Sequence, residues 1–243
     1  MKYILIIGAK SDIAVEIAKV YAENGYNLYL TGREISKLTD LAKDLKIRYD
    51  VDVQLKELDI INFNSHQNFY ENLQPKPIGA IVVSGYMNEQ KICEQNWDES
   101  LNTINVNFTG AVSILNIIAN DFEKNRDGFI VGISSVAGER GRKANYIYGS
   151  SKAGFTTYLS GLRNRLFENN ISVLTVLPGF VDTKMTEGLD LPAKLTAKPK
   201  DVALEIFNAQ QKGKNILYTK SIWFLIMLII KSIPEFIFKK LSI

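Results

Sequence analysis

Three residues within one stretch of the chain could transfer a proton. Tyr148 and Lys152 stand four residues apart in a segment whose periodicity indicates a helix, so their side chains are expected on one face, one turn apart. An ammonium group near a phenol favours the phenolate and should lower the pKa of Tyr148 from its ordinary value of about 10. Ser135 follows a short apolar run and could polarise the same substrate oxygen. This arrangement predicts general acid catalysis.

The elements that must position these residues alternate along the chain. Short apolar runs predict strands at 3–7, 27–31, 52–58, 80–84, 128–133 and 172–177, and periodic segments predict helices at 13–24, 35–49, 66–73, 97–125 and 146–169. Continuous apolar strands between amphipathic helices indicate a single-domain α/β fold with a doubly wound parallel sheet of the Rossmann type. Ligands bind such sheets beyond the carboxyl ends of the strands, where Gly8, Asp59, Ser84 and Ser135 are expected.

Composition narrows the class of protein. The 243 residues suffice for one large α/β domain, and 29 basic against 26 acidic residues leave a net charge of only +3, which gives no sign of a nucleic-acid partner. A single cysteine, Cys93, excludes an internal disulfide and fits a reducing compartment. The apolar run 3–7 is too short for a signal peptide. We therefore expect a cytoplasmic protein, and we predict no metal site.

The segment ISSVAG, which contains Ser135, together with Tyr148 and Lys152 resembles the Ser…Tyr-x-x-x-Lys signature of the short-chain dehydrogenases/reductases. The resemblance extends over about residues 3–186. It implies NADPH-dependent reduction of a ketone, in which Tyr148 protonates the oxygen, Ser135 hydrogen-bonds it, and Lys152 lowers the pKa of Tyr148 and binds the nicotinamide ribose. It also implies that Asn107 helps to hold a water in a proton relay behind Lys152; a neutral structural role is the alternative for this asparagine.

The turn after the first strand resembles the Gly-x-x-x-Gly-x-Gly loop of that family, with Asp12 and Ala14 in place of the last two glycines. Backbone amides at a helix N-terminus attract phosphate, so the cofactor pyrophosphate is expected against this loop. The residues expected to bind the cofactor here are Gly8, Lys10, Ser11, Asp12 and Ile13. Asp12 itself is interpreted as the N-cap of the following helix.

The end of the second strand predicts which nicotinamide cofactor is bound. A carboxylate at that position would hold the ribose 2′-hydroxyl of NADH, whereas Gly32 followed by Arg33 suits a 2′-phosphate, with Lys10 close by. We therefore predict NADP(H). The alternative is that Arg33 is an ordinary surface charge at the start of a helix.

The remaining cofactor residues are implied by the resemblance alone. Asp59 corresponds to the aspartate beside the adenine ring. Ser84 and Gly85 occupy the place of an Asn-Asn-Ala-Gly stretch, of which only the glycine is kept. The turn after the sixth strand matches the segment that meets the nicotinamide carboxamide, through Pro178, Gly179, Val181 and Thr183. Residues 184–198 correspond to a mobile substrate lid.

The C-terminal tail carries nine consecutive apolar residues, 222–230, between Lys220 and Lys231. A membrane-spanning helix needs about 20 such residues, so this segment is too short to cross a bilayer unaided. Two interpretations stay open: peripheral contact with the inner face of a membrane, anchored by Trp223, or burial in the core or against a partner subunit. We divide the chain into a catalytic domain, 1–215, and a hydrophobic tail, 216–243.

Three features together resemble the decaprenylphosphoryl-2-ketopentose reductases: the sequence of the loop after the first strand, the absence of the Asn-Asn-Ala-Gly stretch, and the hydrophobic tail. That similarity implies a keto-sugar carried on a polyprenyl phosphate, in cell-envelope glycan synthesis, as the substrate. Reduction of a fatty or other apolar ketone is an alternative, and a non-catalytic NADPH-binding regulator or scaffold is another. The family resemblance further implies a homodimer or homotetramer.

Overall fold

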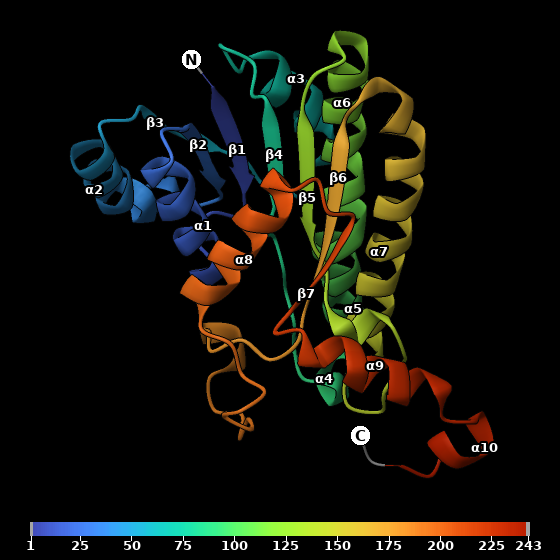
Figure 1. Cartoon of the computed structure of the whole chain (residues 1–243). Coiled ribbons are helices and arrows are strands. Elements are labelled where there is room, and N and C mark those ends of the chain that lie inside the picture. Colours follow the sequence, from blue (N-terminus) through green and yellow to red (C-terminus); the bar gives the residue numbers. More distant parts are fainter. Residues whose placement is uncertain (1, 242–243) are drawn as a thin grey trace.

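The computed structural model describes residues 2–241 and contains one sheet of seven parallel strands (Figure 1). The strands are β1 (Tyr3–Ile7), β2 (Asn27–Gly32), β3 (Val53–Glu57), β4 (Gly79–Val82), β5 (Phe129–Ile133), β6 (Ser172–Pro178) and β7 (Ile216–Thr219). Their order in the sheet is β3-β2-β1-β4-β5-β6-β7, and every neighbouring pair is parallel. This order confirms the predicted doubly wound α/β fold.

Helices cover both faces of the sheet. One face carries α1 (Asp12–Glu23), α2 (Thr39–Tyr49) and α8 (Pro199–Gln211); the other carries α3 (His66–Glu71), α6 (Gly110–Asn125) and α7 (Tyr146–Leu166) (Figure 1). Because side chains alternate along a strand, Ile4 and Ile6 of β1 pack into the first of these two cores, and Leu5 and Ile7 into the second. Strands buried on both faces explain the unbroken apolar runs in the sequence.

The helical region predicted at 97–125 is one continuous rod with an irregular centre. It consists of α5 (Trp97–Ile104), a π-helical turn (Asn105–Thr109) and α6. By length and composition alone this rod could cross a membrane, but Ile114, Ile118 and Phe122 are buried against the sheet. It is therefore a core helix, and its π-turn lies near the carboxyl ends of the strands, a place where such turns often serve function.

Three elements were not predicted: α4 (Gln90–Gln95), α8 and β7. β7 belongs to the sheet although it lies on the tail side of the predicted boundary at residue 216, and that division of the chain stays a prediction. Short 3₁₀ turns occupy Ile35–Leu38, Phe63–Ser65, Val136–Gly138, Phe167–Asn169 and Lys184–Thr186. Residues 242–243, the end of the predicted tail, lie outside the described residues.

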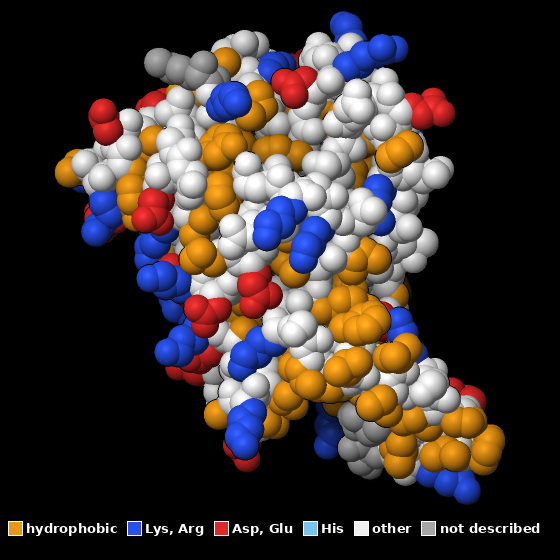
Figure 2. Space-filling view, viewed as in Figure 1, with side chains coloured by type: hydrophobic (Ala, Val, Ile, Leu, Met, Phe, Trp, Pro, Cys, Tyr) orange, Lys and Arg blue, Asp and Glu red, His pale blue; other side chains and the backbone are white. Residues whose placement is uncertain are grey.

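The tail after β7 forms α9 (Ile222–Ser232) and α10 (Glu235–Phe238), which extend from the end of the molecule where the strands finish (Figure 1). One face of α9 is buried against the domain through Trp223, Met227 and Ile230. The opposite face is exposed, and hydrophobic side chains gather over α9 and α10 in Figure 2. Burial against the domain therefore applies to the Trp223 face of α9, and membrane contact through the opposite face stays a prediction.

Two residues of the loop after β5 hold the tail in place. Arg140 donates hydrogen bonds to the carbonyl oxygens of Ile230 (2.5 Å) and Ile233 (2.7 Å), and its guanidinium stacks 3.7 Å from the centre of the Phe238 ring. Glu139 accepts hydrogen bonds from Lys231 and from the Tyr218 hydroxyl. These contacts join the tail to the same loop that begins with Ser135.

Candidate active site

Ser135, Tyr148 and Lys152 line one cavity of about 370 Å³ at the carboxyl edge of the sheet. Ser135 lies two residues beyond the end of β5, where its side chain accepts a hydrogen bond from the amide of Ala137 at 3.1 Å. Tyr148 is in the first turn of α7, and Ser135 hydrogen-bonds its hydroxyl. The three residues predicted from spacing are thus brought together at the point where a doubly wound sheet binds its ligands.

Lys152 is one turn further along α7, and its side chain is buried. Its ammonium donates to the carbonyl oxygen of Ile133 at 3.0 Å and lies 5.8 Å from the centre of the Tyr148 ring. Burial without a carboxylate partner lowers the pKa of Lys152 to about 8. The lysine therefore points along the cavity behind the tyrosine, as the four-residue spacing predicted.

The predicted pKa of Tyr148 is wrong in direction. Burial of the phenol raises its pKa to about 12, because the phenolate would lose its hydration, and the hydrogen bond with Ser135 offsets only part of that rise. The sequence indicated the neighbouring charge of Lys152 but gave no measure of burial. At neutral pH the hydroxyl keeps its proton, which is the form that a proton donor needs.

Asn107 lies at the centre of the π-helical turn, and its side chain forms hydrogen bonds with backbone groups of the protein. Its amide donates to the carbonyl oxygens of Tyr86 (2.6 Å) and Thr103 (2.9 Å), and its Oδ1 accepts from the Tyr86 amide (3.0 Å). Asn107 thereby fixes the loop after β4, which contains Ser84 and Gly85. These contacts favour the structural alternative, and the role of Asn107 in a water relay stays a prediction.

The loop after β1 differs from its prediction in one residue. The N-cap of α1 is Ser11, whose side chain accepts from the Ala14 amide at 3.2 Å, and not Asp12. The Asp12 carboxylate instead accepts a hydrogen bond from the Lys184 amide at 2.8 Å. Serine and aspartate are both favoured N-cap residues, so the sequence could not decide between Ser11 and Asp12. The hydrogen bond from the Lys184 amide to Asp12 explains why Asp12 does not cap the helix.

Gly8 is required where this loop passes closest to β4. Its φ is +86°, in the left-handed region, and a Cβ there would lie 2.7 Å from the amide nitrogen of Ser84. The contact places Gly8 and Ser84 side by side at the edge of the sheet between β1 and β4, where the strand order reverses. A nucleotide can therefore approach the backbone closely at this point.

A second cavity, of about 250 Å³, collects the residues predicted for the adenosine half of a dinucleotide. It is lined by Gly8, Lys10, Ser11, Gly32, Arg33, Asp59, Ser84 and Gly85, among others. Lys10, Ser11 and Gly85 also line the first cavity, so the two adjoin. Phosphate groups would find suitable donors here in Lys10, Arg33 and the amides at the start of α1. Lys10 also forms an ion pair with Glu34. The residues present fit NADP(H).

The predicted nicotinamide-side residues Pro178, Gly179, Val181 and Thr183 all line the first cavity, and so do Asp12 and Ile13 of the predicted pyrophosphate loop. Gly179 is needed for packing, because a Cβ at this position would overlap the indole ring of Trp223. Thr183 begins a short 3₁₀ turn closed by a capping box with Thr186. All the residues predicted from the resemblance thus lie on the two cavities, except Asn107, which supports the loop between them.

The segment predicted as a substrate lid, 184–198, is held at both ends. Asp12 binds the amide of Lys184 at one end. At the other, the Lys220 ammonium donates to the carbonyl oxygens of Lys194 and Thr196, both at 2.8 Å, and the Trp223 indole donates to that of Leu195 at 3.1 Å. The start of the C-terminal tail therefore holds the segment that covers the cavity.

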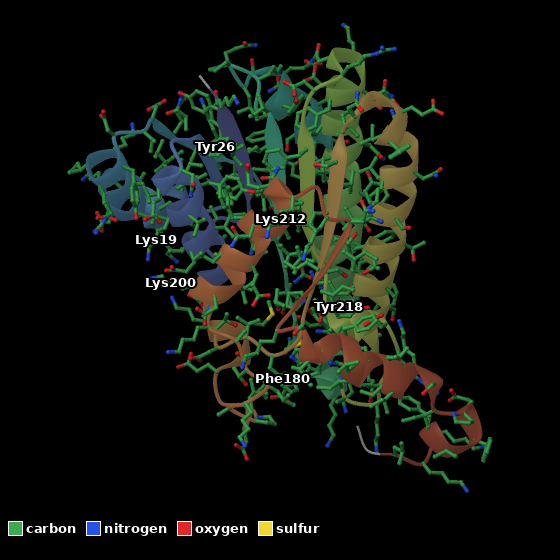
Figure 3. All side chains as sticks on the ribbon, in the orientation of Figure 1. Lys19, Tyr26, Phe180, Lys200, Lys212 and Tyr218 are labelled. Carbon is green, nitrogen blue, oxygen red and sulfur yellow. The ribbon has the colours of Figure 1, made fainter. Side chains whose placement is uncertain are left out.

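Several residues of the cavity were not predicted as site residues. They include Met87, Arg142, Asn145, Phe180 and Trp223. Phe180, labelled in Figure 3, comes from the loop after β6 and meets the Trp223 ring edge to face, with centroids 5.0 Å apart. Trp223 was expected to anchor the tail at a membrane, and that expectation is wrong, because its side chain is 3% exposed and forms a wall of the cavity. Nothing in the apolar run indicated which of its faces would pack on the domain.

Comparison with known proteins is consistent with this geometry. The family model described as short chain dehydrogenase matches residues 2–193. The chain is 30% identical to an uncharacterized oxidoreductase of Mycobacterium tuberculosis, over 98% of this chain and 96% of the relative. It is also 30% identical to the NADP-dependent 3-hydroxy acid dehydrogenase of Schizosaccharomyces pombe, over 76% of this chain and 73% of that protein. Its fold is similar to a solved short-chain dehydrogenase from Sphingobium yanoikuyae in complex with NADPH, with a TM-score of 0.83, 20% identity and 97% of each chain covered.

Proposed function

Because the chain belongs to the short-chain dehydrogenase family, we propose that it is an NADPH-dependent reductase that converts a ketone to a secondary alcohol. The observation that carries the proposal is the convergence of Ser135, Tyr148 and Lys152 on one cavity beside a second cavity that fits a dinucleotide. The names of two similar proteins mention NADP or NADPH, which supports the choice of cofactor. Bound NADPH would supply the hydride to the carbonyl carbon.

The protein residues then handle the carbonyl oxygen. Tyr148 carries its proton at neutral pH, because burial raises its pKa to about 12, and donates that proton to the oxygen as negative charge develops. Ser135 donates a hydrogen bond to the same oxygen. The buried ammonium of Lys152 lies behind the phenol and stabilises the phenolate that remains.

The test of this proposal is Tyr148→Phe. Phenylalanine fills nearly the same volume but has no proton to give, so NADPH should bind as to the wild type while turnover falls by about 10²- to 10⁴-fold. Calorimetric titration with NADPH measures binding, and loss of NADPH absorbance in the presence of a panel of ketones measures turnover. Undiminished reduction by the variant would contradict the role of Tyr148.

We propose a keto-sugar on a polyprenyl phosphate as the substrate, with a fatty or other apolar ketone as the alternative. The walls of the first cavity support a substrate with an apolar part, since Met87, Phe180, Met185, Leu189 and Trp223 line it. If the substrate is carried on a lipid, the exposed apolar face of the tail could contact the membrane in which that lipid lies. Turnover of a polyprenyl-linked keto-sugar but not of a fatty ketone would decide between the two.

We further propose that the tail binds the inner face of a membrane peripherally, the remainder of the protein being cytoplasmic. The exposed apolar side chains of α9 and α10 are Ile222, Phe224, Leu225, Leu228, Ile229, Phe236 and Ile237. Lys239 and Lys240 are exposed beside them and would meet anionic headgroups, whereas Lys231 is paired with Glu139. A single helix of 11 residues suits insertion at the headgroup level.

The membrane proposal is tested by sedimentation with vesicles that contain anionic lipid. The wild type should sediment, and a variant with Leu228→Glu and Ile229→Glu, both on the exposed face, should stay in solution. Ile47→Glu is the matched control, because Ile47 is 85% exposed on the distant helix α2 and its variant should sediment as the wild type does. If the double variant sediments as well, the membrane proposal fails. If it instead converts the proposed homodimer or homotetramer to monomers in analytical ultracentrifugation, the exposed face is a subunit contact.

A further inference from the structure

A cationic side chain faces the substrate end of the first cavity without a carboxylate partner. Arg142 lines that cavity together with Ser135 and Tyr148. It forms no ion pair with any residue in the range 2–241. Its Nη2 donates one hydrogen bond, to the carbonyl oxygen of Val136 at 3.3 Å, and its buried Nε has no partner among those residues. The residue as a whole is half-buried, and a buried guanidinium N–H without an acceptor is costly unless a ligand supplies one.

The carboxylate nearest in sequence does not neutralise this charge. Glu139 accepts hydrogen bonds from the Lys231 ammonium and the Tyr218 hydroxyl, so its charge is balanced by the tail. Burial lowers the pKa of Arg142 and the charge of Glu139 raises it, but an arginine stays protonated at any physiological pH. Arg142 therefore adds to the cavity a positive charge that no carboxylate pairs with in the range 2–241.

Asn145 supplies a second unused polar group beside Arg142. It occupies the N-cap position of α7, yet its side chain makes no capping hydrogen bond. The amide of Ile147, which such a cap would satisfy, instead donates to Oε1 of Gln90, from α4, at 3.1 Å. The Oδ1 atom of Asn145 is buried without a partner within the described chain, and the residue lines the same cavity. Gln90 thus leaves Asn145 free to meet a ligand.

We infer that Arg142 and Asn145 form a subsite for an anionic group of the substrate, a phosphate ester or a carboxylate attached to an apolar body. The inference rests on the proposed reductase function and names the class of ketone that the site selects. Guanidinium donors match the paired oxygens of phosphate and carboxylate, whereas the unpartnered Oδ1 of Asn145 is an acceptor and would take a hydrogen bond from a substrate hydroxyl beside the anion. The apolar walls would hold the remainder of the molecule.

The test compares ligands that differ only in the anionic group. Farnesyl phosphate and farnesol form one pair, and decanoate and decanol the other, each titrated calorimetrically into protein saturated with NADP⁺. The wild type should bind the anion of at least one pair about 10-fold or more tightly than its alcohol, since hydrogen bonds to charged groups are the strong ones. Whichever pair shows the larger preference identifies the anion as phosphate or carboxylate.

Arg142→Gln should remove that preference, leaving the affinity for the alcohol within about 2-fold, and Arg142→Lys, which keeps the charge, should retain part of it. Lys143→Gln is the control, because Lys143 is exposed and does not line the cavity. The inference is overturned if the wild type binds anion and alcohol equally, or if Arg142→Gln keeps the preference. Failure of the proposed function is a separate outcome: no ketone oxidises NADPH, while the preference for the anion persists.

Discussion

Replacing Gly179 with alanine should disturb the cavity through the tail. The added Cβ would lie inside the indole of Trp223, closer than the 3.0 Å that real Cβ contacts keep, so the ring must move. Trp223 is 3% exposed, packs on Phe180 and donates to the Leu195 carbonyl oxygen at 3.1 Å. Its displacement would therefore loosen both the wall of the cavity and the end of the lid segment.

The cost has two parts. Overpacking a buried site costs about 1–3 kcal/mol, and the loss of the indole hydrogen bond about 0.5–1.5 kcal/mol. A total of about 1.5–4.5 kcal/mol should lower the midpoint of thermal unfolding by roughly 3–18 °C in a domain of this size. Because the indole lines the cavity proposed to hold the substrate, turnover of a ketone should also fall by about 10-fold or more.

Differential scanning calorimetry and steady-state kinetics measure the two effects. Gly161→Ala is the control, because Gly161 is exposed in α7 with no atom within 4 Å of the added Cβ. That variant should gain about 0.5–1 kcal/mol through helix propensity and keep full activity. If Gly179→Ala unfolds at the wild-type temperature and turns over normally, Trp223 does not pack on Gly179 as described, and the coupling of tail to cavity is refuted.

The remaining predictions concern charged side chains. Burial lowers the pKa of Lys152 from 10.5 to about 8, so between pH 8 and pH 10.5 the unfolded chain binds more protons than the folded one. The free energy of unfolding should therefore rise with pH over this range, by at most about 3 kcal/mol, and urea titrations of Lys152→Met should lack this rise. Arg33→Ala and Lys10→Ala should each weaken NADPH binding by about 10-fold without changing NADH binding, because each removes a cation that would face the 2′-phosphate; equal losses for both nucleotides in calorimetry would contradict this. Arg140→Ala should speed hydrogen exchange in the last turn of α9 and in α10, because Arg140 binds the carbonyl oxygens of Ile230 and Ile233 and stacks on the Phe238 ring. Unchanged exchange would show that these contacts do not hold the tail.

The sheet and the central triad of residues could be predicted because both depend on short-range sequence patterns. The first strand and the helix at 146–169 follow from apolar periodicity, and Tyr148 and Lys152 share a helix face by spacing alone. The π-turn was not predicted, because a single change of hydrogen-bond register leaves the apolar period almost intact. β7 was not predicted, because its apolar run, Ile216 to Tyr218, is only three residues long, and at the edge of the sheet Thr219 is the one buried residue of the strand.

Properties that depend on contacts distant in sequence could not be predicted. The pKa of Tyr148 is set by burial, which spacing does not report. Asp12 lost the role of N-cap to Ser11, and its carboxylate reaches Lys184, which is 172 positions away. Nothing in the sequence singled out Arg142, and only the fold places it in the cavity that Ser135 and Tyr148 line.

The burial of one indole and the exposure of the other give this protein a built-in optical reporter. The chain contains two tryptophans: Trp97 is 67% exposed at the start of α5, whereas Trp223 is 3% exposed and lines the cavity. A water-borne quencher such as iodide should therefore extinguish the emission of Trp97 and spare that of Trp223. In a Trp97→Phe variant, all the remaining indole emission would come from the cavity wall. A reduced nicotinamide bound in the cavity would absorb the emission of Trp223, so binding could be measured as quenching of this intrinsic fluorescence, without a label.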